Sequence, residues 1–119
     1  MAEPVEIRLE KSRRVLVVEF DDGQVFELPC EYLRTHSPSA EVRGHGLSEP
    51  KLMTGKENVN IERIEPIGSY AVALHFDDGH NTGLYSWSFL YKLGVNMDSN
   101  LTRYAERLRQ ASRPDQEKP

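Results

Sequence analysis

The chain has 119 residues, with 38% hydrophobic and 29% charged residues, which is typical of one ordinary globular domain and not of a disordered chain. Its formal net charge of −4 argues against nonspecific binding to nucleic acid or to anionic membranes, because both favour basic surfaces. Cys30 is the only cysteine, so the sequence excludes an internal disulfide and a CxxC metal or redox motif, and favours a reducing compartment.

The N-terminus predicts a cytoplasmic protein. Met1 to Pro4 carries an acidic residue where a signal peptide has basic ones, and no apolar core follows it. No segment reaches the run of roughly 20 apolar residues that a membrane span requires.

The first third of the chain predicts three strands, at Val5–Leu9, Val15–Phe20 and Gln24–Leu28. Asp21-Asp22-Gly23 between the last two is a hairpin signal. A three-residue turn with Gly23 in the left-handed conformation separates apolar from charged side chains, whereas a two-residue turn does not. The predicted register puts these residues on one face: Leu16, Val18, Phe20, Phe26 and Leu28.

A short helix is predicted at Pro29–Arg34, because proline is favoured in the first turn of a helix. Tyr32 and Leu33 would point inward from it. The following stretch, His36–Asn58, has no clean periodicity, and a loop of this length in a compact domain is usually functional or disordered.

The second half of the chain repeats this plan. We expect strands at Val59–Ile64, Tyr70–Phe76 and His80–Leu84, with turns at Pro66–Gly68 and at Asp77-Asp78-Gly79. Ser86 is predicted to cap a helix that runs to about Leu93 and stops at Gly94. A last helix, capped by Asp98 or Ser99, would run to about Ala111 and bury Leu101, Tyr104, Ala105 and Leu108.

The phrase Phe-Asp-Asp-Gly therefore occurs twice, at Phe20–Gly23 and at Phe76–Gly79, 56 residues apart. The same offset pairs Leu28 with Leu84 and Leu33 with Phe89. The repeat reflects either a duplication or the same turn used twice. The predicted fold is α+β: one small, mainly antiparallel domain over residues 1–111, made of two β-hairpin-plus-helix units and a C-terminal helix, followed by a disordered tail at 112–119.

Several side chains are candidates for catalysis, metal binding or anion binding. Cys30 near a helix start has no positioned base in sequence, which favours a packed residue over a nucleophile. His75 and Asp77 match part of an iron facial triad, but no later histidine has suitable spacing. His36, His45 and His80 are the remaining candidate metal ligands. Arg34 with Arg43 is a candidate anion site, and the arginines at 103, 107 and 109 are a solvated face or a docking surface for an acidic partner.

Three segments together resemble the DUF971 family, which is similar to the N-terminal domain of gamma-butyrobetaine hydroxylase: Leu33–Gly46, Phe76–His80 and Gly83–Trp87 with Leu90. The N-terminal domain of the hydroxylases resembles a zinc module with three cysteines and one histidine, so the resemblance implies these four ligand positions. Those cysteine positions fall at Ser37, Ser39 and Val42, and His80 matches the histidine. Because zinc sites use about four N, S or O ligands, we predict that the family's zinc site is lost here.

The resemblance does not extend to a dioxygenase domain, so we predict no enzymatic activity and no cofactor. It implies an accessory role near iron–sulfur or other metallocofactor assembly, with a P-loop iron–sulfur carrier as the suggested protein partner. The predicted contact surface comprises Arg34, Ser37, Pro38, Arg43, His45, His80 and Trp87. A zinc or iron site around His80, with His36 or His45, is the alternative, and a small enzyme is the third hypothesis.

Overall fold

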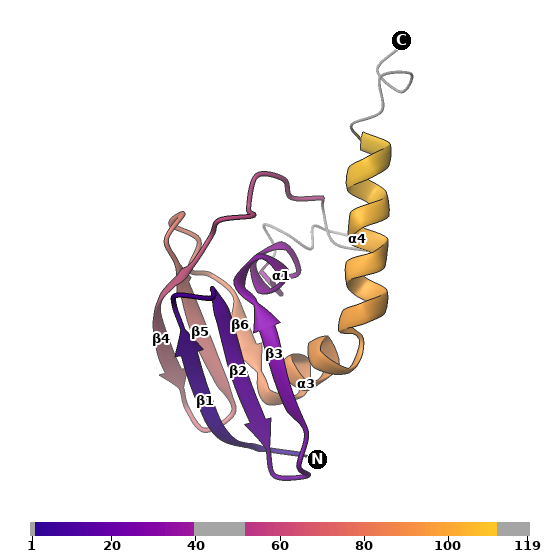
Figure 1. Ribbon diagram of the computed structural model, residues 1–119. Coiled ribbons are helices and arrows are strands. Elements are labelled where there is room, and N and C mark those ends of the chain that lie inside the picture. Colours follow the sequence, from indigo (N-terminus) through magenta and orange to yellow (C-terminus); the bar gives the residue numbers. More distant parts are fainter. Residues whose placement is uncertain (1, 40–51, 112–119) are drawn as a thin grey trace.

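The computed structural model describes residues 2–39 and 52–111, which form two three-stranded antiparallel sheets with short helices and a C-terminal helix (Figure 1). This arrangement confirms the predicted α+β fold. The predicted tail at 112–119 lies outside the described residues. In chain order the elements are β1 (Pro4–Glu10), β2 (Val15–Phe20), β3 (Val25–Pro29), α1 (Cys30–Thr35), β4 (Ile61–Ile67), β5 (Ala71–Phe76), β6 (Leu84–Ser86), α3 (Trp87–Val95) and α4 (Met97–Ala111).

The first sheet has the strand order β1-β2-β3, and its hairpin has the predicted three-residue turn. The amide of Phe20 donates to the carbonyl of Gln24 at 2.8 Å, and Gly23 has a φ of 90°. Leu16 pairs with Leu28 and Val18 with Phe26, so the apolar side chains share the inner face as the charge pattern predicted.

The second sheet, β4-β5-β6, corrects one predicted turn. Pro66 and Ile67 are strand residues that pair with Val72 and Ala71, and the turn lies at residues 68–70, where Gly68 has a φ of 56°. Proline is tolerated there because β4 is an edge strand, where a missing N–H need not break the ladder.

The second hairpin contains one residue more than the first. Both turns close alike, since the amide of Phe76 donates to the carbonyl of His80 at 3.0 Å. In the first hairpin Val17 pairs with Glu27. The 56-residue offset makes Ala73 equivalent to Val17 and residue 83 equivalent to Glu27, but Ala73 pairs with Leu84. The extra residue lies between His80 and Leu84, so the predicted strand His80–Leu84 is wrong. Leu84 is 49% exposed and Tyr85 takes the buried position.

The helices largely match the prediction in place but not at their ends. Pro29 is the N-cap of α1, and Tyr32 and Leu33 are buried as expected. The Ser86 side chain accepts a hydrogen bond from the Phe89 amide and caps α3, which confirms that prediction. Gly94 does not stop α3; it lies within the helix against the ring of Phe26, where a Cβ would be 2.4 Å from a ring carbon.

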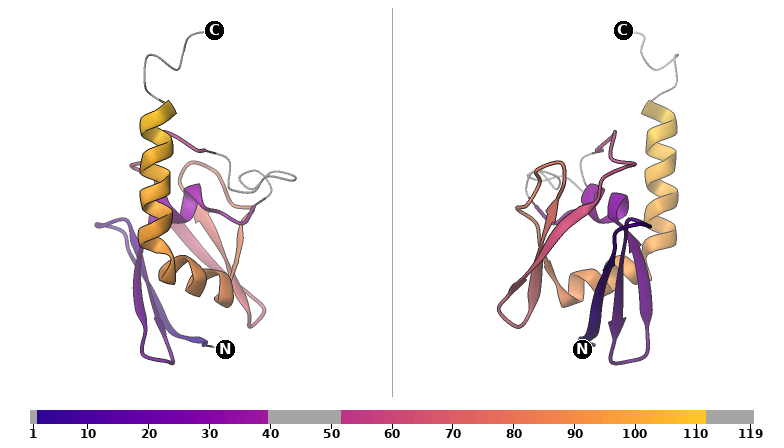
Figure 2. Two further views of the ribbon diagram at one scale, coloured as in Figure 1. Left: turned by 90° about the vertical axis from the view of Figure 1, so that its right-hand side faces the viewer. Right: turned by 60° about the vertical axis from the view of Figure 1, so that its left-hand side comes forward.

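Helix α4 begins at Met97, so Asp98 and Ser99 lie in its first turn and are not the cap that we predicted. Tyr104 is the one buried residue of the predicted stripe; Leu101 and Leu108 are half-buried, and Ala105 is exposed. The stripe fails at Ala105 because the C-terminal half of α4 extends away from the sheets (Figure 2).

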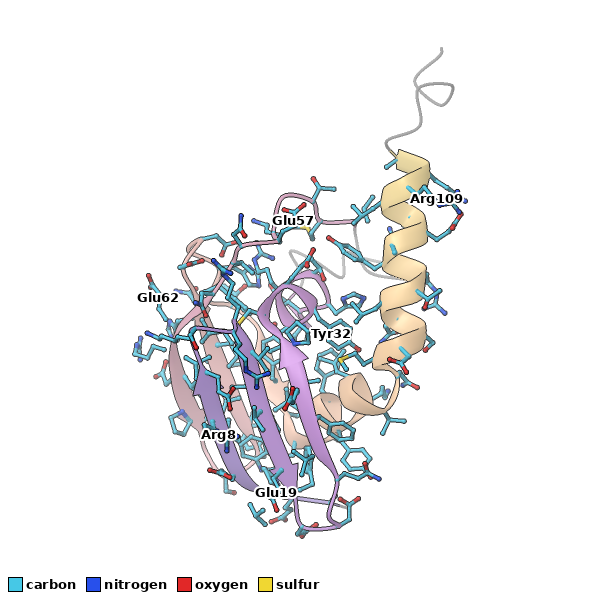
Figure 3. All side chains as sticks on the ribbon, in the orientation of Figure 1. Arg8, Glu19, Tyr32, Glu57, Glu62 and Arg109 are labelled. Atoms are coloured by element: carbon cyan, nitrogen blue, oxygen red, sulfur yellow. The ribbon has the colours of Figure 1, made fainter. Side chains whose placement is uncertain are left out.

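The core lies between the two sheets, with α3 near one end of them (Figure 2). Two buried tyrosines anchor it. The Tyr32 hydroxyl donates to the carbonyl of Leu93 in α3 and the Tyr85 hydroxyl to that of Leu33 in α1, both at 2.6 Å. Figure 3 shows Tyr32 pointing from α1 toward the helices. These bonds tie the two structural units together.

Candidate functional site

The residues that follow α1 pack against the loop between β5 and β6. The hydroxyl oxygen of Ser37 lies 3.1 Å from Nε2 of His80, and the hydroxyls of Ser39 and Thr82 are 2.7 Å apart. Ser37 is fully buried and His80 is 5% exposed. We call the four residues Ser37, Ser39, His80 and Thr82 the serine–histidine cluster.

Local geometry explains this close approach. The extra residue in the β5–β6 loop turns the chain after His80 out of the simple ladder, as bulges do. Gly83 then passes directly over Ser37, where a Cβ would lie 2.5 Å from the serine oxygen. Ser37 also accepts a hydrogen bond from the Ser39 amide at 3.2 Å. Gly83 is therefore required by packing against Ser37.

A charged group borders the cluster. Nε of Arg34 and Nζ of Lys56 both donate to Oδ2 of Asp78, at 2.8 and 2.7 Å, and the amide of His80 donates to Oδ1 at 3.1 Å. Desolvation alone would raise the pKa of the Asp78 carboxyl. The hydrogen bonds from Lys56, His80 and Arg34 outweigh it and hold that pKa at about 2. Asp78 is therefore a carboxylate that fixes the hairpin to α1.

The other predicted site residues lie elsewhere or are not described. The His36 ring packs against Tyr32 and Tyr104, with centroid distances of 4.8 and 5.9 Å, and so faces α4. Trp87 donates its indole N–H to the carbonyl of Ser69 at 2.8 Å. Val42, Arg43 and His45 lie outside the described residues.

A family model for gamma-butyrobetaine hydroxylase-like, N-terminal domains matches residues 7–91, which include all four residues of the serine–histidine cluster. The chain belongs to the gamma-butyrobetaine hydroxylase-like N-terminal domain family. The resemblance read from the sequence is thereby confirmed.

Solved structures that are similar to this chain agree with this assignment. Two proteins with NMR solution structures are 50% and 42% identical to this chain, and both have TM-scores of 0.81. Each match covers 95% of this chain; it covers 84% of the first protein's chain and 89% of the second's. A crystal structure of a protein of unknown function from Acidithiobacillus ferrooxidans ATCC 23270, placed in the DUF971 family, is 41% identical. The match covers 76% of this chain and 91% of that one, with a TM-score of 0.65. No curated protein matches.

Three residues of the cluster, Ser37, Ser39 and His80, stand at positions where the resemblance implies zinc ligands. Ser37 and Ser39 stand at two of the implied cysteine positions, and they do meet His80. Neutral hydroxyls, however, are not the thiolate, imidazole or carboxylate ligands that zinc prefers. Within residues 2–39 and 52–111, no three His, Cys, Asp or Glu side chains lie close enough to hold a metal ion. The described residues therefore do not fit a zinc ion.

The candidate catalytic side chains of this family member are dispersed. The Cys30 thiol is buried beside the Asn60 amide oxygen, and this burial raises its pKa, which opposes thiolate formation. Nε2 of His75 pairs with Glu65 at 2.9 Å on β4. Asp77 instead accepts from the Asn60 amide at 3.1 Å. These hydrogen bonds thus do not join Cys30, His75 and Asp77 directly to one another.

Sequence reasoning missed four contributors to the site: Lys56, Asp78, Thr82 and Tyr85. The sequence pattern indicates only a turn at Asp78, and Lys56 belongs to a segment without periodicity. The 56-residue offset predicts a buried Leu84, but Leu84 is exposed and Tyr85 is buried in its place. This burial raises the pKa of Tyr85. None of the helices in the described part of this family member is long and apolar enough to span a bilayer.

Proposed function

We propose that this domain is a non-enzymatic interaction module that docks on a larger protein. One observation carries the proposal: Ser37 and Ser39 hydrogen-bond directly with His80 and Thr82, at positions where related domains would place metal ligands. Such bonds hold two chain segments in one shape. Ser37 is fully buried, so its hydroxyl does not face solvent, where a substrate would bind. In this proposal the two joined segments serve to build a surface.

The surface that we propose lies over this cluster. Ser37 and His80 are buried, so in this proposal they support the surface from below. Asn81, Thr82 and Leu84 are exposed, and Pro38 and Trp87 are half-buried. An apolar side chain such as Leu84 beside polar ones is typical of protein interfaces.

A protein partner fits the charge of the chain better than a nucleic acid or an anionic membrane, because the net charge is −4. A P-loop iron–sulfur carrier is the partner class that we propose, by association with such carriers in this family. Cytoplasmic location follows from that assignment.

The test is affinity capture from the native cell, with and without crosslinking, followed by quantitative mass spectrometry. The wild-type chain is compared with Leu84→Glu and with Val25→Glu, which introduces the same charge at a 54% exposed residue of the other sheet. We expect one protein to be lost with Leu84→Glu and retained with Val25→Glu. Recovery of no stable partner under either condition would count against the interaction module.

The convergence of Ser37, Ser39 and His80 favours metal binding as the second candidate function, with zinc or iron as the metal. Since serine is a weak ligand, this function needs further donors such as His45. Elemental analysis of purified protein and the NMR shifts of the histidine rings during metal titration separate the two functions. Metal-free protein with unshifted rings rejects the metal site.

A further inference from the structure

Arg34 is the most confined cation in the site and uses little of its hydrogen-bonding capacity. The residue is 7% exposed, and its Nε donates to Asp78. Its Nη1 atom is buried and has no hydrogen-bond partner among the residues that the structure describes. A buried, unpaired guanidinium nitrogen is unfavourable, and such atoms mark positions where an ion or a ligand completes the network.

The side chains of Arg34, Lys56 and Asp78 together carry one excess positive charge. Arg34 and Lys56 each carry one positive charge, and they share a single carboxylate oxygen, Oδ2 of Asp78. The other oxygen of Asp78 is already occupied by the His80 amide. The local group therefore has a net charge of about +1 and attracts an anion, although the chain as a whole is acidic.

The group is accessible from one side. The side chains of Lys56 and Asp78 are 21% and 22% exposed, so the Arg34 guanidinium lies one hydrogen bond below the surface. The partly exposed pair of Lys56 and Asp78 is easily exchanged for another, because such pairs contribute little to stability. An incoming anion that takes the ammonium of Lys56 would then lie beside the guanidinium of Arg34, because Nε of Arg34 and Nζ of Lys56 contact the same oxygen of Asp78.

We propose that Arg34 and Lys56 bind one carboxylate group of the partner protein, from an aspartate or glutamate side chain or from its C-terminus. The inference rests on the proposed interaction function and gives its partner an acidic contact residue. A planar guanidinium matches the geometry of a carboxylate, and a monoanion matches the single excess charge. A phosphate dianion would exceed that charge.

The test uses free acetate as the probe, so it requires no partner. The ¹⁵N NMR signals of the Arg34 Nε–H and of the His80 amide are followed in sodium acetate, in sodium chloride and in sodium phosphate, at constant ionic strength. We expect a saturable shift in acetate, and we expect Lys56→Gln to weaken acetate binding roughly tenfold because one charged donor is lost. Lys92→Gln, which removes the same charge from an exposed position in α3, should bind like the wild type.

The outcomes separate this inference from the proposed function. No shift of the Arg34 Nε–H, an equal shift in chloride, or equal weakening by Lys56→Gln and Lys92→Gln would overturn the anion site. Stronger binding of phosphate than of acetate would overturn the choice of a carboxylate. If the wild-type chain captures a partner that Lys56→Gln and Arg34→Lys capture equally well, the interaction module stands and the carboxylate contact does not.

Discussion

The Nε2 atom of His80 lies 3.1 Å from the hydroxyl oxygen of Ser37, and the two residues are 43 positions apart in the chain. This contact joins the end of α1 to the β5–β6 hairpin. In the hydroxylase-like domains the resemblance places a metal between these positions. Here one hydrogen bond makes the connection, and both side chains are buried.

Replacing Ser37 by alanine should destabilise the domain. The change removes one hydrogen-bond partner of the His80 ring and one acceptor of the Ser39 amide, and both groups remain buried. We expect a loss of about 1–3 kcal/mol in the free energy of unfolding. Urea denaturation measures it, with Ser12→Ala at an exposed turn as the control. Equal stability of the two variants would show that the Ser37 contact contributes nothing.

Restoring thiolates should restore metal binding. In the double variant Ser37→Cys/Ser39→Cys, two thiolates join the His80 imidazole, which are the ligand types that zinc and cobalt prefer. We expect Co²⁺ to give a thiolate charge-transfer absorption band that the wild-type chain lacks. Adding His80→Ala should weaken that band. A double variant with no band would mean that the three side chains do not converge as the structure places them.

Gly94→Ala separates helix propensity from packing. Alanine stabilises a helix interior by up to about 1 kcal/mol relative to glycine. At this position, however, a Cβ would be 2.4 Å from the Phe26 ring. Overpacking of a core typically costs about 1–3 kcal/mol, so we expect net destabilisation in a thermal or urea melt. A stabilised Gly94→Ala variant would contradict the close approach of α3 to β3.

The Asp78 carboxylate should make stability depend on pH in the acid range. Its pKa in the folded protein is about 2, below the ordinary aspartate value of 3.8. A depressed pKa gives stability that is present above about pH 4 and is lost as the pH falls toward 2. The shift corresponds to about 2 kcal/mol. Between pH 6 and pH 3, the urea midpoint should fall less for Asp78→Asn than for the wild type. An equal fall in both proteins would show that the Asp78 carboxylate is not the source of this pH dependence.

The single thiol should be unreactive in the folded protein. Cys30 is fully buried, and its burial raises the pKa of the thiol. We therefore expect an aromatic disulfide reagent at pH 8 to modify Cys30 only as the chain unfolds, with the rate following added urea. Rapid modification without denaturant would show that the start of α1 is open to solvent.

The sequence determined the features that depend on near neighbours. Charge segregation on the two faces of a hairpin selected the three-residue turn, and Gly23 supplied the left-handed residue that the turn needs. The Ser86 cap followed from local backbone groups that need an acceptor. Family membership likewise followed from short motifs, because these lie at fixed spacings along the chain.

Only the tertiary structure decided which residues meet at the site. The extra residue before Leu84 leaves the hairpin pattern intact in sequence, yet it exposes Leu84 and buries Tyr85. The same loop carries His80 to Ser37, whereas His36, one residue away from Ser37, faces α4. Such contacts join segments that are far apart in the chain, and periodicity within each segment does not encode them. The second Phe-Asp-Asp-Gly turn belongs to the candidate site because Arg34 and Ser37 pack against it.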